Sequence, residues 1–225
     1  MPVDVKICGL RDHRAVHAAV EGNARYLGFM FYPRSPRAVT PREAVELGKA
    51  VPADRIKVGV MVDPDDRLLD QALAGLDAIQ LHGQETPERV RTVKANAGKT
   101  VIKALRLGDT DDLAPLDDYA EVADMILFDA KPPSSPGSLP GGNGLTFDWR
   151  LLKGLRLSRP WLLAGGLNID NLDEAIRLCH APAVDVSSGV ESEPGVKDID
   201  KIRTFLKKAA GLSPPNGSTI TEKRT

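Results

Sequence analysis

The sequence predicts a single (β/α)8 barrel, also called a TIM barrel. Short β-rich apolar runs alternate with longer segments of helical periodicity along almost the whole chain. Polar residues gather at the C-terminal ends of several of these runs, and 225 residues suit one barrel. An open doubly wound sheet is the alternative. It more often carries a G-x-G-x-x-G turn after its first strand, and Cys8-Gly9-Leu10 does not match that pattern.

Eight apolar runs are the predicted strands. They are Val3–Cys8, Arg25–Phe31, Ile56–Val62, Ala78–His82, Thr100–Leu107, Met125–Phe128, Trp161–Leu163 and Ala183–Val186. Repetition of strand, helix and strand implies parallel pairing with right-handed crossovers. Eight units of about 26 residues lie near the lower size limit of this barrel.

The predicted helices lie between these runs and have polar faces. They are Asp12–Glu21, Pro41–Ala50, Asp65–Ala74, Pro87–Asn96, Leu113–Val122, Leu172–Leu178 and Ile199–Lys208. Thr40-Pro41 and Thr86-Pro87 each place an N-cap residue before a first-turn proline, and Asn168 is expected to open another helix.

Two segments do not fit this alternation. Pro132–Gly144 is rich in proline, glycine and serine, so it is expected to be a loop, either a lid that orders on binding or a simple insertion. Ser213–Thr225 has no core-forming pattern and is expected to be disordered. The sequence therefore predicts one domain, residues 1–212, with a tail at 213–225.

Composition argues against several classes of partner. The 30 Lys and Arg residues against 31 Asp and Glu give no basic field for nucleic acid or an anionic membrane. No apolar run approaches the ~20 residues that span a bilayer, and the N-terminus lacks a signal-peptide pattern. Two cysteines do not make a disulfide scaffold, and the four histidines show no metal-ligand spacing. We expect a cytoplasmic protein that binds no metal, nucleic acid or membrane.

Strand alternation predicts which side chains face the barrel interior. Val5 and Ile7 share one face of the first strand, and Lys6 and Cys8 share the other. The same parity directs a set of polar residues to one rim, where barrel enzymes place their chemistry. The set is Lys6, Cys8, Asp63, Gln80, His82, Asp129, Asp185 and Ser187. A structural alternative is that Lys6 and Asp185 only form a buried ion pair and that Cys8 is a small core residue. Cys179 is expected to be a core residue.

Two glycine-containing motifs predict a phosphate site. Leu163–Leu167 (LAGGL) follows the seventh strand, and Ser187–Glu191 (SSGVE) follows the eighth. Small residues at these two ends let backbone N–H groups approach an anion. A phosphorylated small molecule is the expected substrate class. Arg34 and Arg37 follow the second strand, where a guanidinium could pair with a substrate carboxylate in bidentate fashion or simply face solvent.

Five motifs together resemble the phosphoribosylanthranilate isomerase family of tryptophan biosynthesis. They are Lys6–Gly9 (KICG), Gln80–Gly83 (QLHG), Gly141–Trp149 (GGNGLTFDW), Gly165–Asn168 (GGLN) and Val184–Glu191 (VDVSSGVE), and the likeness runs from residue 3 to about residue 210. The resemblance implies a (β/α)8 enzyme without cofactor. It would convert N-(5-phosphoribosyl)anthranilate into 1-(2-carboxyphenylamino)-1-deoxyribulose 5-phosphate by an Amadori rearrangement. Family members are single barrels or dimers, so a monomer or homodimer is expected.

The resemblance also implies residue roles. Cys8 would be the general base, Asp129 the general acid and Arg37 the ligand of the anthranilate carboxylate. The backbone around Gly165, Gly166, Ser188 and Gly189 would hold the phosphate, and His82, Asp185 and Ser187 would complete the substrate site.

The acid–base roles make demands on pKa values. A free thiol is only about 3% thiolate at pH 7, so a lowered Cys8 pKa would help, and Lys6 could favour the anion. An unperturbed aspartate is only about 0.1% protonated at pH 7. The pKa of Asp129 must therefore be raised, or Asp129 must become protonated in the substrate complex.

Three other functions compete with this one. A Schiff-base aldolase would use Lys103 in the fifth strand, although its parity with Val101 and Leu105 favours the helix-facing side. A histidine-pathway sugar-phosphate isomerase would use carboxylates for both roles, which Cys8 argues against. A barrel that binds phosphate ligands without turnover would need neither Cys8 nor Asp129.

Overall fold

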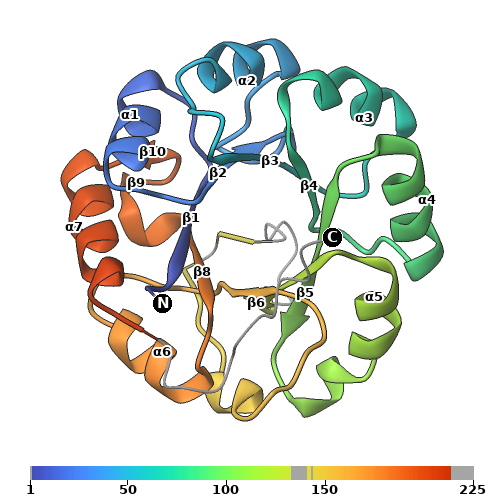
Figure 1. Cartoon of the computed structure of the whole chain (residues 1–225), viewed down its shortest axis with the longest axis vertical. Coiled ribbons are helices and arrows are strands. Elements are labelled where there is room, and N and C mark those ends of the chain that lie inside the picture. Colours follow the sequence, from blue (N-terminus) through green and yellow to red (C-terminus); the bar gives the residue numbers. More distant parts are fainter. Residues whose placement is uncertain (1, 133–140, 143, 214–225) are drawn as a thin grey trace.

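Eight parallel strands form a closed barrel in the order of the sequence (Figure 1). The computed structural model describes residues 2–132, 141–142 and 144–213. The strands are β1 (Asp4–Cys8), β2 (Tyr26–Met30), β3 (Ile56–Met61), β4 (Ala78–Leu81), β5 (Thr100–Leu107), β6 (Met125–Ala130), β7 (Trp161–Leu163) and β8 (Ala183–Val186). β8 pairs with β1, and this closure confirms the barrel and excludes the open doubly wound sheet.

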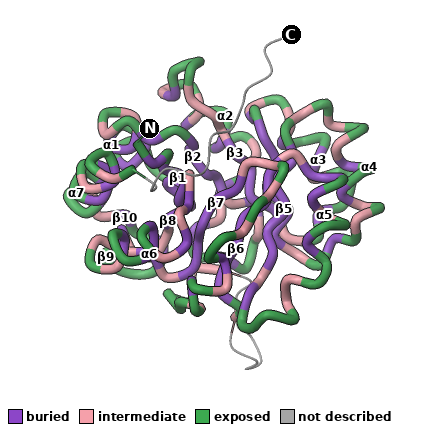
Figure 2. Tube along the Cα trace, turned by 60° about the horizontal axis from the view of Figure 1, so that its bottom comes forward, coloured by how far each residue is buried: buried purple, intermediate pink, exposed green. Residues whose placement is uncertain are grey.

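The helices surround the strands as an outer ring (Figure 1). They are α1 (His13–Glu21), α2 (Pro41–Gly48), α3 (Asp66–Ala72), α4 (Pro87–Ala97), α5 (Leu116–Val122), α6 (Leu172–Cys179) and α7 (Ile199–Ala210). Strands are largely buried, whereas the helices carry exposed residues on their outward sides (Figure 2). Each predicted helix overlaps an observed one, and the predicted and observed ends differ by at most three residues.

Side-chain caps explain where several helices begin. Thr40 forms a capping box with Glu43 before Pro41, and the Thr86 hydroxyl accepts a hydrogen bond from the Arg89 N–H. Asn168 instead accepts hydrogen bonds from the N–H groups of residues 170 and 171. These bonds form a turn, so α6 begins at Leu172.

Two local features were not predicted. Between β6 and β7 the described residues contain only a short 3-10 helix, Trp149–Leu152, whose two terminal side chains are buried and cover the sheet there. After β8 the chain forms a small antiparallel hairpin of β9 (Glu191–Glu193) and β10 (Val196–Lys197) before α7.

Alternation along the strands separates two apolar clusters. Ile7, Phe128 and Val184 belong to the larger cluster, which packs between the strands and the helices. Val58 and Leu127 belong to the smaller cluster inside the barrel. The predicted parity is thus confirmed, and it directs Lys6, Gln80, Asp129 and Asp185 to the interior.

The predicted tail lies outside the described residues, apart from Ser213, and most of Pro132–Gly144 does too. Among the residues that the structure describes, no helix has the length and apolar character required to cross a membrane.

Candidate active site

A pocket opens at the C-terminal ends of the barrel strands. It has about 810 Å³ of free space, part of it open to solvent. Nine of the ten predicted site residues line it, namely Cys8, Arg37, His82, Asp129, Gly165, Gly166, Asp185, Ser187 and Ser188. The tenth, Gly189, lies next to the pocket residue Ser188.

Asp63 does not join this pocket, contrary to the sequence-based expectation. It adopts a left-handed backbone conformation (φ 45°), and its carboxylate accepts a hydrogen bond from the Gln84 N–H at 2.7 Å. Its own N–H donates to Glu85 at 2.9 Å. The turn after β3 therefore directs this carboxylate to the β4–α4 loop.

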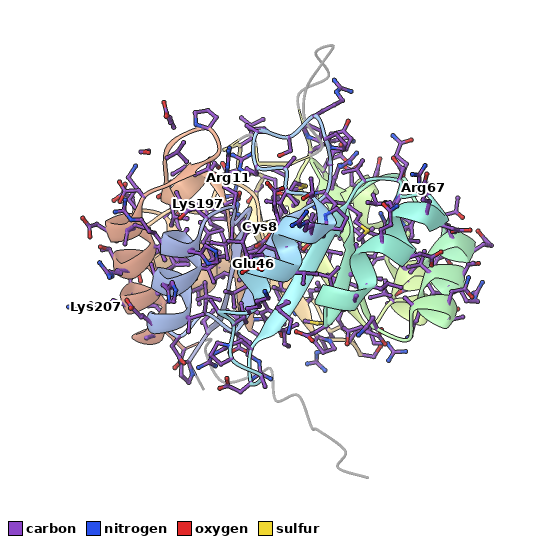
Figure 3. The ribbon with its side chains drawn as sticks, turned by 90° about the horizontal axis from the view of Figure 1, so that it is seen from above. Cys8, Arg11, Glu46, Arg67, Lys197 and Lys207 are labelled. Atoms are coloured by element: carbon purple, nitrogen blue, oxygen red, sulfur yellow. The ribbon has the colours of Figure 1, made fainter. Side chains whose placement is uncertain are left out.

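Cys8 lies at the end of β1 above a buried ion pair. Lys6 Nζ donates to Asp185 Oδ1 at 3.0 Å, and the expected pairing of these two residues is confirmed. A Cβ atom on Gly28 would lie 3.1 Å from Lys6 Nζ and 3.2 Å from Cys8 Sγ. The ammonium and the thiol therefore lie side by side over the bare backbone of β2. Cys8 is buried, and its label lies near the centre of the view in Figure 3.

The local environment sets the protonation preferences of this pair. Burial raises the pKa of the Cys8 thiol, and the nearby Lys6 ammonium only partly opposes it. In this structure the effect of burial on the Cys8 pKa outweighs the opposing effect of Lys6. Burial also opposes the charged form of Lys6, but Asp185 and Cys8 raise the Lys6 pKa above its ordinary value. Lys6 stays a cation and can stabilise a thiolate once one forms.

Asp129 lies at the end of β6 in a hydrogen-bonded series with His82 and Gln80. Its Oδ2 lies 3.0 Å from His82 Nε2, and its Oδ1 accepts the Ala130 N–H at 2.8 Å. Gln80 Nε2 lies 2.8 Å from His82 Nδ1. In this orientation of the Gln80 amide its nitrogen donates to His82 Nδ1, which assigns the ring proton to Nε2, the atom that faces Asp129. The series holds the Asp129 carboxylate in one orientation.

Arg37 is buried and has an acidic partner that the sequence analysis missed. Its Nε and Nη2 each donate to the Glu191 carboxylate at 2.8 Å. Lys197 donates to the same carboxylate at 2.7 Å. Glu191 is the last residue of the Val184–Glu191 motif, so its position in that motif could have marked it as a site residue. Lys197 lies in a short hairpin without periodicity, so no such indication was present in the sequence.

The glycine motifs bring bare backbone to the pocket. Gly165 and Gly166 have φ of +87° and +61°. A Cβ on Gly166 would lie 2.7 Å from the carbonyl oxygen of Leu145, and one on Gly189 only 1.9 Å from that of Leu167. Within the described part of the chain, the N–H groups of Gly165 and Gly166 have no acceptor. Such N–H groups suit an anion like phosphate.

Lys103 lies on the other side of the sheet. Its Nζ donates to Glu85 at 2.7 Å and to the carbonyl oxygen of Gly83 at 3.0 Å, and it does not line the pocket. Burial lowers its pKa, although Glu85 opposes that shift. The helix-facing position that its parity favoured is confirmed, which removes the residue that a Schiff-base aldolase would need. No group of three or more metal-ligating side chains occurs in the described ranges.

Comparison with known proteins gives a consistent family. The sequence model described as N-(5′-phosphoribosyl)anthranilate (PRA) isomerase matches residues 5–208. A relative from Paracoccus denitrificans, named N-(5′-phosphoribosyl)anthranilate isomerase, is 59% identical over 211 residues, covering 93% of this chain and 98% of the relative.

Solved structures that resemble this chain carry the same family name. One is described as monomers generated from dimeric phosphoribosylanthranilate isomerase of Thermotoga maritima, with 38% identity and a TM-score of 0.79 over 93% of this chain and 100% of that one. Another is an isomerase of this name in complex with reduced 1-(o-carboxyphenylamino)-1-deoxyribulose 5-phosphate, with 35% identity, the same TM-score and the same coverage.

Proposed function

Because this chain belongs to the N-(5′-phosphoribosyl)anthranilate isomerase family and catalyses that isomerisation in tryptophan biosynthesis, we propose that Cys8 and Asp129 are its general base and general acid. The observation that carries the proposal is that both side chains line one pocket, at the ends of β1 and β6. The product is 1-(2-carboxyphenylamino)-1-deoxyribulose 5-phosphate.

Each residue has a defined proton to move. Asp129 donates a proton to the furanose ring oxygen, the C1′–O bond breaks, and a Schiff base forms between C1′ and the anthranilate nitrogen. Cys8 then removes the C2′ proton, which gives an enolamine. Return of a proton to C1′ and loss of the proton on the C2′ oxygen give the ketose, so no proton is gained or lost overall.

The surroundings of each group support these roles. Lys6 beside Cys8 favours the thiolate form that a base requires, against the effect of burial. His82 contacts Oδ2 of Asp129, so it orients the acid as well as bordering the substrate. Asp185 keeps Lys6 in place through their ion pair, and Ser187 donates to the Cys8 carbonyl oxygen at 3.1 Å.

The phosphate and the anthranilate carboxylate of the substrate require separate binding groups in the pocket. We assign the phosphate to the backbone at Gly165, Gly166, Ser188 and Gly189, because side chains added at the three glycines would collide with neighbouring atoms. We assign the anthranilate carboxylate to Arg37, the buried cation of the β2–α2 loop that borders the pocket.

We also propose a cytoplasmic location and a working unit of one barrel or a homodimer. Both cysteines are free, which suits a reducing compartment. The small phosphosugar is the expected ligand, and nucleic acid is not. Light scattering at several protein concentrations measures whether the unit is one chain or two.

An isomerase assay tests the assignment of acid and base. Phosphoribosylanthranilate is generated in situ, and the loss of its fluorescence is followed with wild type, Cys8→Ala and Asp129→Ala. Both variants should lose several orders of magnitude in kcat. The matched control is Cys179→Ala, which removes the other buried cysteine and should retain activity. Activity within tenfold of wild type in either pocket variant would remove that residue from the mechanism.

A further inference from the structure

Glu191 is a buried carboxylate that receives four hydrogen bonds. The donors are Arg37 Nε and Nη2 at 2.8 Å each, Lys197 Nζ at 2.7 Å and the Gly195 N–H at 3.2 Å. Its side chain is 4% exposed. Burial alone would raise the Glu191 pKa, but Arg37 and Lys197 together hold it below the ordinary value. Glu191 is therefore a charged group at the centre of this cluster.

Glu191 occupies one whole edge of the Arg37 guanidinium. Nε and Nη2 form that edge, and Nη2 also donates to the Gly142 carbonyl oxygen at 3.3 Å. The remaining arm, Nη1, faces Gly142, where a Cβ would lie 2.7 Å away, and Gly142 lines the pocket. The stem of Arg37 packs on Gly9, where a Cβ would lie 2.6 Å from Arg37 Cδ. Arg37 is held on three sides.

The cluster also contains more cations than anions. Arg37 and Lys197 share the single Glu191 carboxylate, and all three side chains are at most 5% exposed. A buried positive charge without its own counter-ion is unfavourable, so such a cluster favours binding of an anion next to it.

Lys197 connects this cluster to the strand end that carries the base. Its Nζ donates to the Ser187 carbonyl oxygen at 2.9 Å and lies 3.3 Å from Ser187 Oγ. Ser187 Oγ in turn donates to the Cys8 carbonyl oxygen at 3.1 Å. Lys197 and Cys8 come from opposite ends of the sequence, but their labels lie near one another in Figure 3, and the Lys197 charge opposes the effect of burial on the Cys8 pKa.

We propose that Glu191 is a positioning residue that determines specificity for an aryl carboxylate. It takes the Nε–Nη2 edge of Arg37 and leaves Nη1, with the excess positive charge of the cluster, to meet the substrate. Recognition of the carboxylate then uses one arm of Arg37 and not the bidentate fork that the sequence suggested. This inference rests on the assignment of Arg37 to the substrate carboxylate.

Two ligands separate positioning from general stability. One is reduced 1-(o-carboxyphenylamino)-1-deoxyribulose 5-phosphate, and the other is the same compound without the ring carboxylate. Calorimetry gives the ratio of their dissociation constants for wild type, Glu191→Gln and Glu191→Asp. The matched control is Glu193→Gln, which alters an exposed glutamate on the same strand.

We expect the wild type to prefer the carboxylate ligand. Glu191→Gln replaces one acceptor oxygen with a donor that faces two cations, so the preference should fall about tenfold, as for one misplaced charge-assisted hydrogen bond. Affinity for the ligand without the carboxylate should stay within about twofold. Glu191→Asp keeps the charge but shortens its reach, so its preference for the carboxylate ligand should lie between those of wild type and Glu191→Gln. It is the informative variant if Glu191→Gln does not fold.

Other results would overturn the proposal. An unchanged or increased preference in both Glu191 variants, or an equal loss for both ligands, would show that Glu191 does not orient Arg37 for the carboxylate. A wild type that does not prefer the carboxylate ligand would overturn the inference together with the Arg37 assignment. In that case activity that still depends on Cys8 and Asp129 would leave the proposed acid and base intact.

Discussion

Lys6 Nζ lies 3.0 Å from Oδ1 of Asp185 and beside the thiol of Cys8. The pair joins the two strands that close the barrel, since Lys6 and Asp185 are register partners in β1 and β8. A buried ion pair that links adjacent strands supports the fold, and its cation also acts on the proposed base.

Removal of the Lys6 charge should shift the reactivity of Cys8. Lys6→Met removes the nearby cation that opposes the effect of burial, so the Cys8 pKa should rise further. The pH dependence of iodoacetamide alkylation, measured in a Cys179→Ala background, should move to higher pH. An alkylation profile identical to that of the parent would refute the role of Lys6. Lys6→Met also leaves Asp185 unpaired, so the experiment is run where circular dichroism shows the fold intact.

Gly28→Ala should reduce activity more than stability. The added methyl would lie 3.1 Å from Lys6 Nζ and from Cys8 Cα and 3.2 Å from Cys8 Sγ, so the base must shift. A misplacement of this kind can lower kcat by about 10²-fold. Steady-state kinetics and thermal unfolding measure the two effects separately.

The control is Gly48→Ala, whose methyl meets only the flexible Lys57 side chain at 3.3 Å and the Gly75 carbonyl oxygen at 3.9 Å. It should leave kcat unchanged. If both alanine variants retain full activity, close packing at Gly28 does not matter to the base.

The orientation of His82 should depend on Gln80. Gln80→Glu replaces the amide donor with an acceptor, so His82 Nδ1 must donate and a neutral ring would present its bare Nε2 to Asp129. We expect kcat to fall by on the order of tenfold and its pH profile to change, with a smaller effect on KM. Gln84→Glu, the same chemical change at an exposed position in the loop that follows β4, should leave the profile as in wild type.

The arrangement of the strands could be predicted because side-chain parity follows directly from the sequence. Lys6 and Lys103 are both buried strand lysines, and parity alone assigns Lys6 to the interior and Lys103 to the helix side. The helix starts after Thr40 and Thr86 could also be predicted, because an N-cap involves only residues within one turn of the helix start. Features that depend only on residues close together in the sequence could therefore be predicted.

The partners of Arg37 could not be predicted, because they depend on a contact across the molecule. Glu191 lies 154 residues from Arg37 in the sequence. Lys197 lies in β10, which has only two residues and therefore no alternation to detect. Asp63 was wrongly assigned to the pocket, because its own positive φ directs its side chain away from the position that strand alternation predicts. Turn geometry of this kind leaves no periodic signal.

Lys103→Met should reduce stability and spare the chemistry. The substitution leaves the buried Glu85 carboxylate without its cation, which typically costs about 3–5 kcal/mol. Folded protein should still isomerise its substrate, and borohydride should trap no adduct at Lys103 in wild type. Lys49→Met, which breaks the exposed pair with Glu46, should change stability by less than about 1 kcal/mol. Chemical denaturation and the isomerase assay measure both outcomes, and loss of kcat in fully folded Lys103→Met would contradict the structural role.

Stability at alkaline pH should decline in part because of Cys179. Burial raises the pKa of this thiol from 9.0 to about 11, so between these values the unfolded chain releases a proton that the folded chain retains. The thiol therefore favours the folded state fully below pH 9, and this contribution is lost as the pH rises toward 11, by up to about 1.4 kcal/mol per pH unit. Urea unfolding at pH 8, 9, 10 and 11 should give a shallower decline for Cys179→Ala than for wild type. The slope, and not the absolute stability, is the readout, because the smaller side chain also leaves a cavity at every pH. Parallel curves for the two proteins would show that Cys179 ionises no differently in the folded and unfolded states.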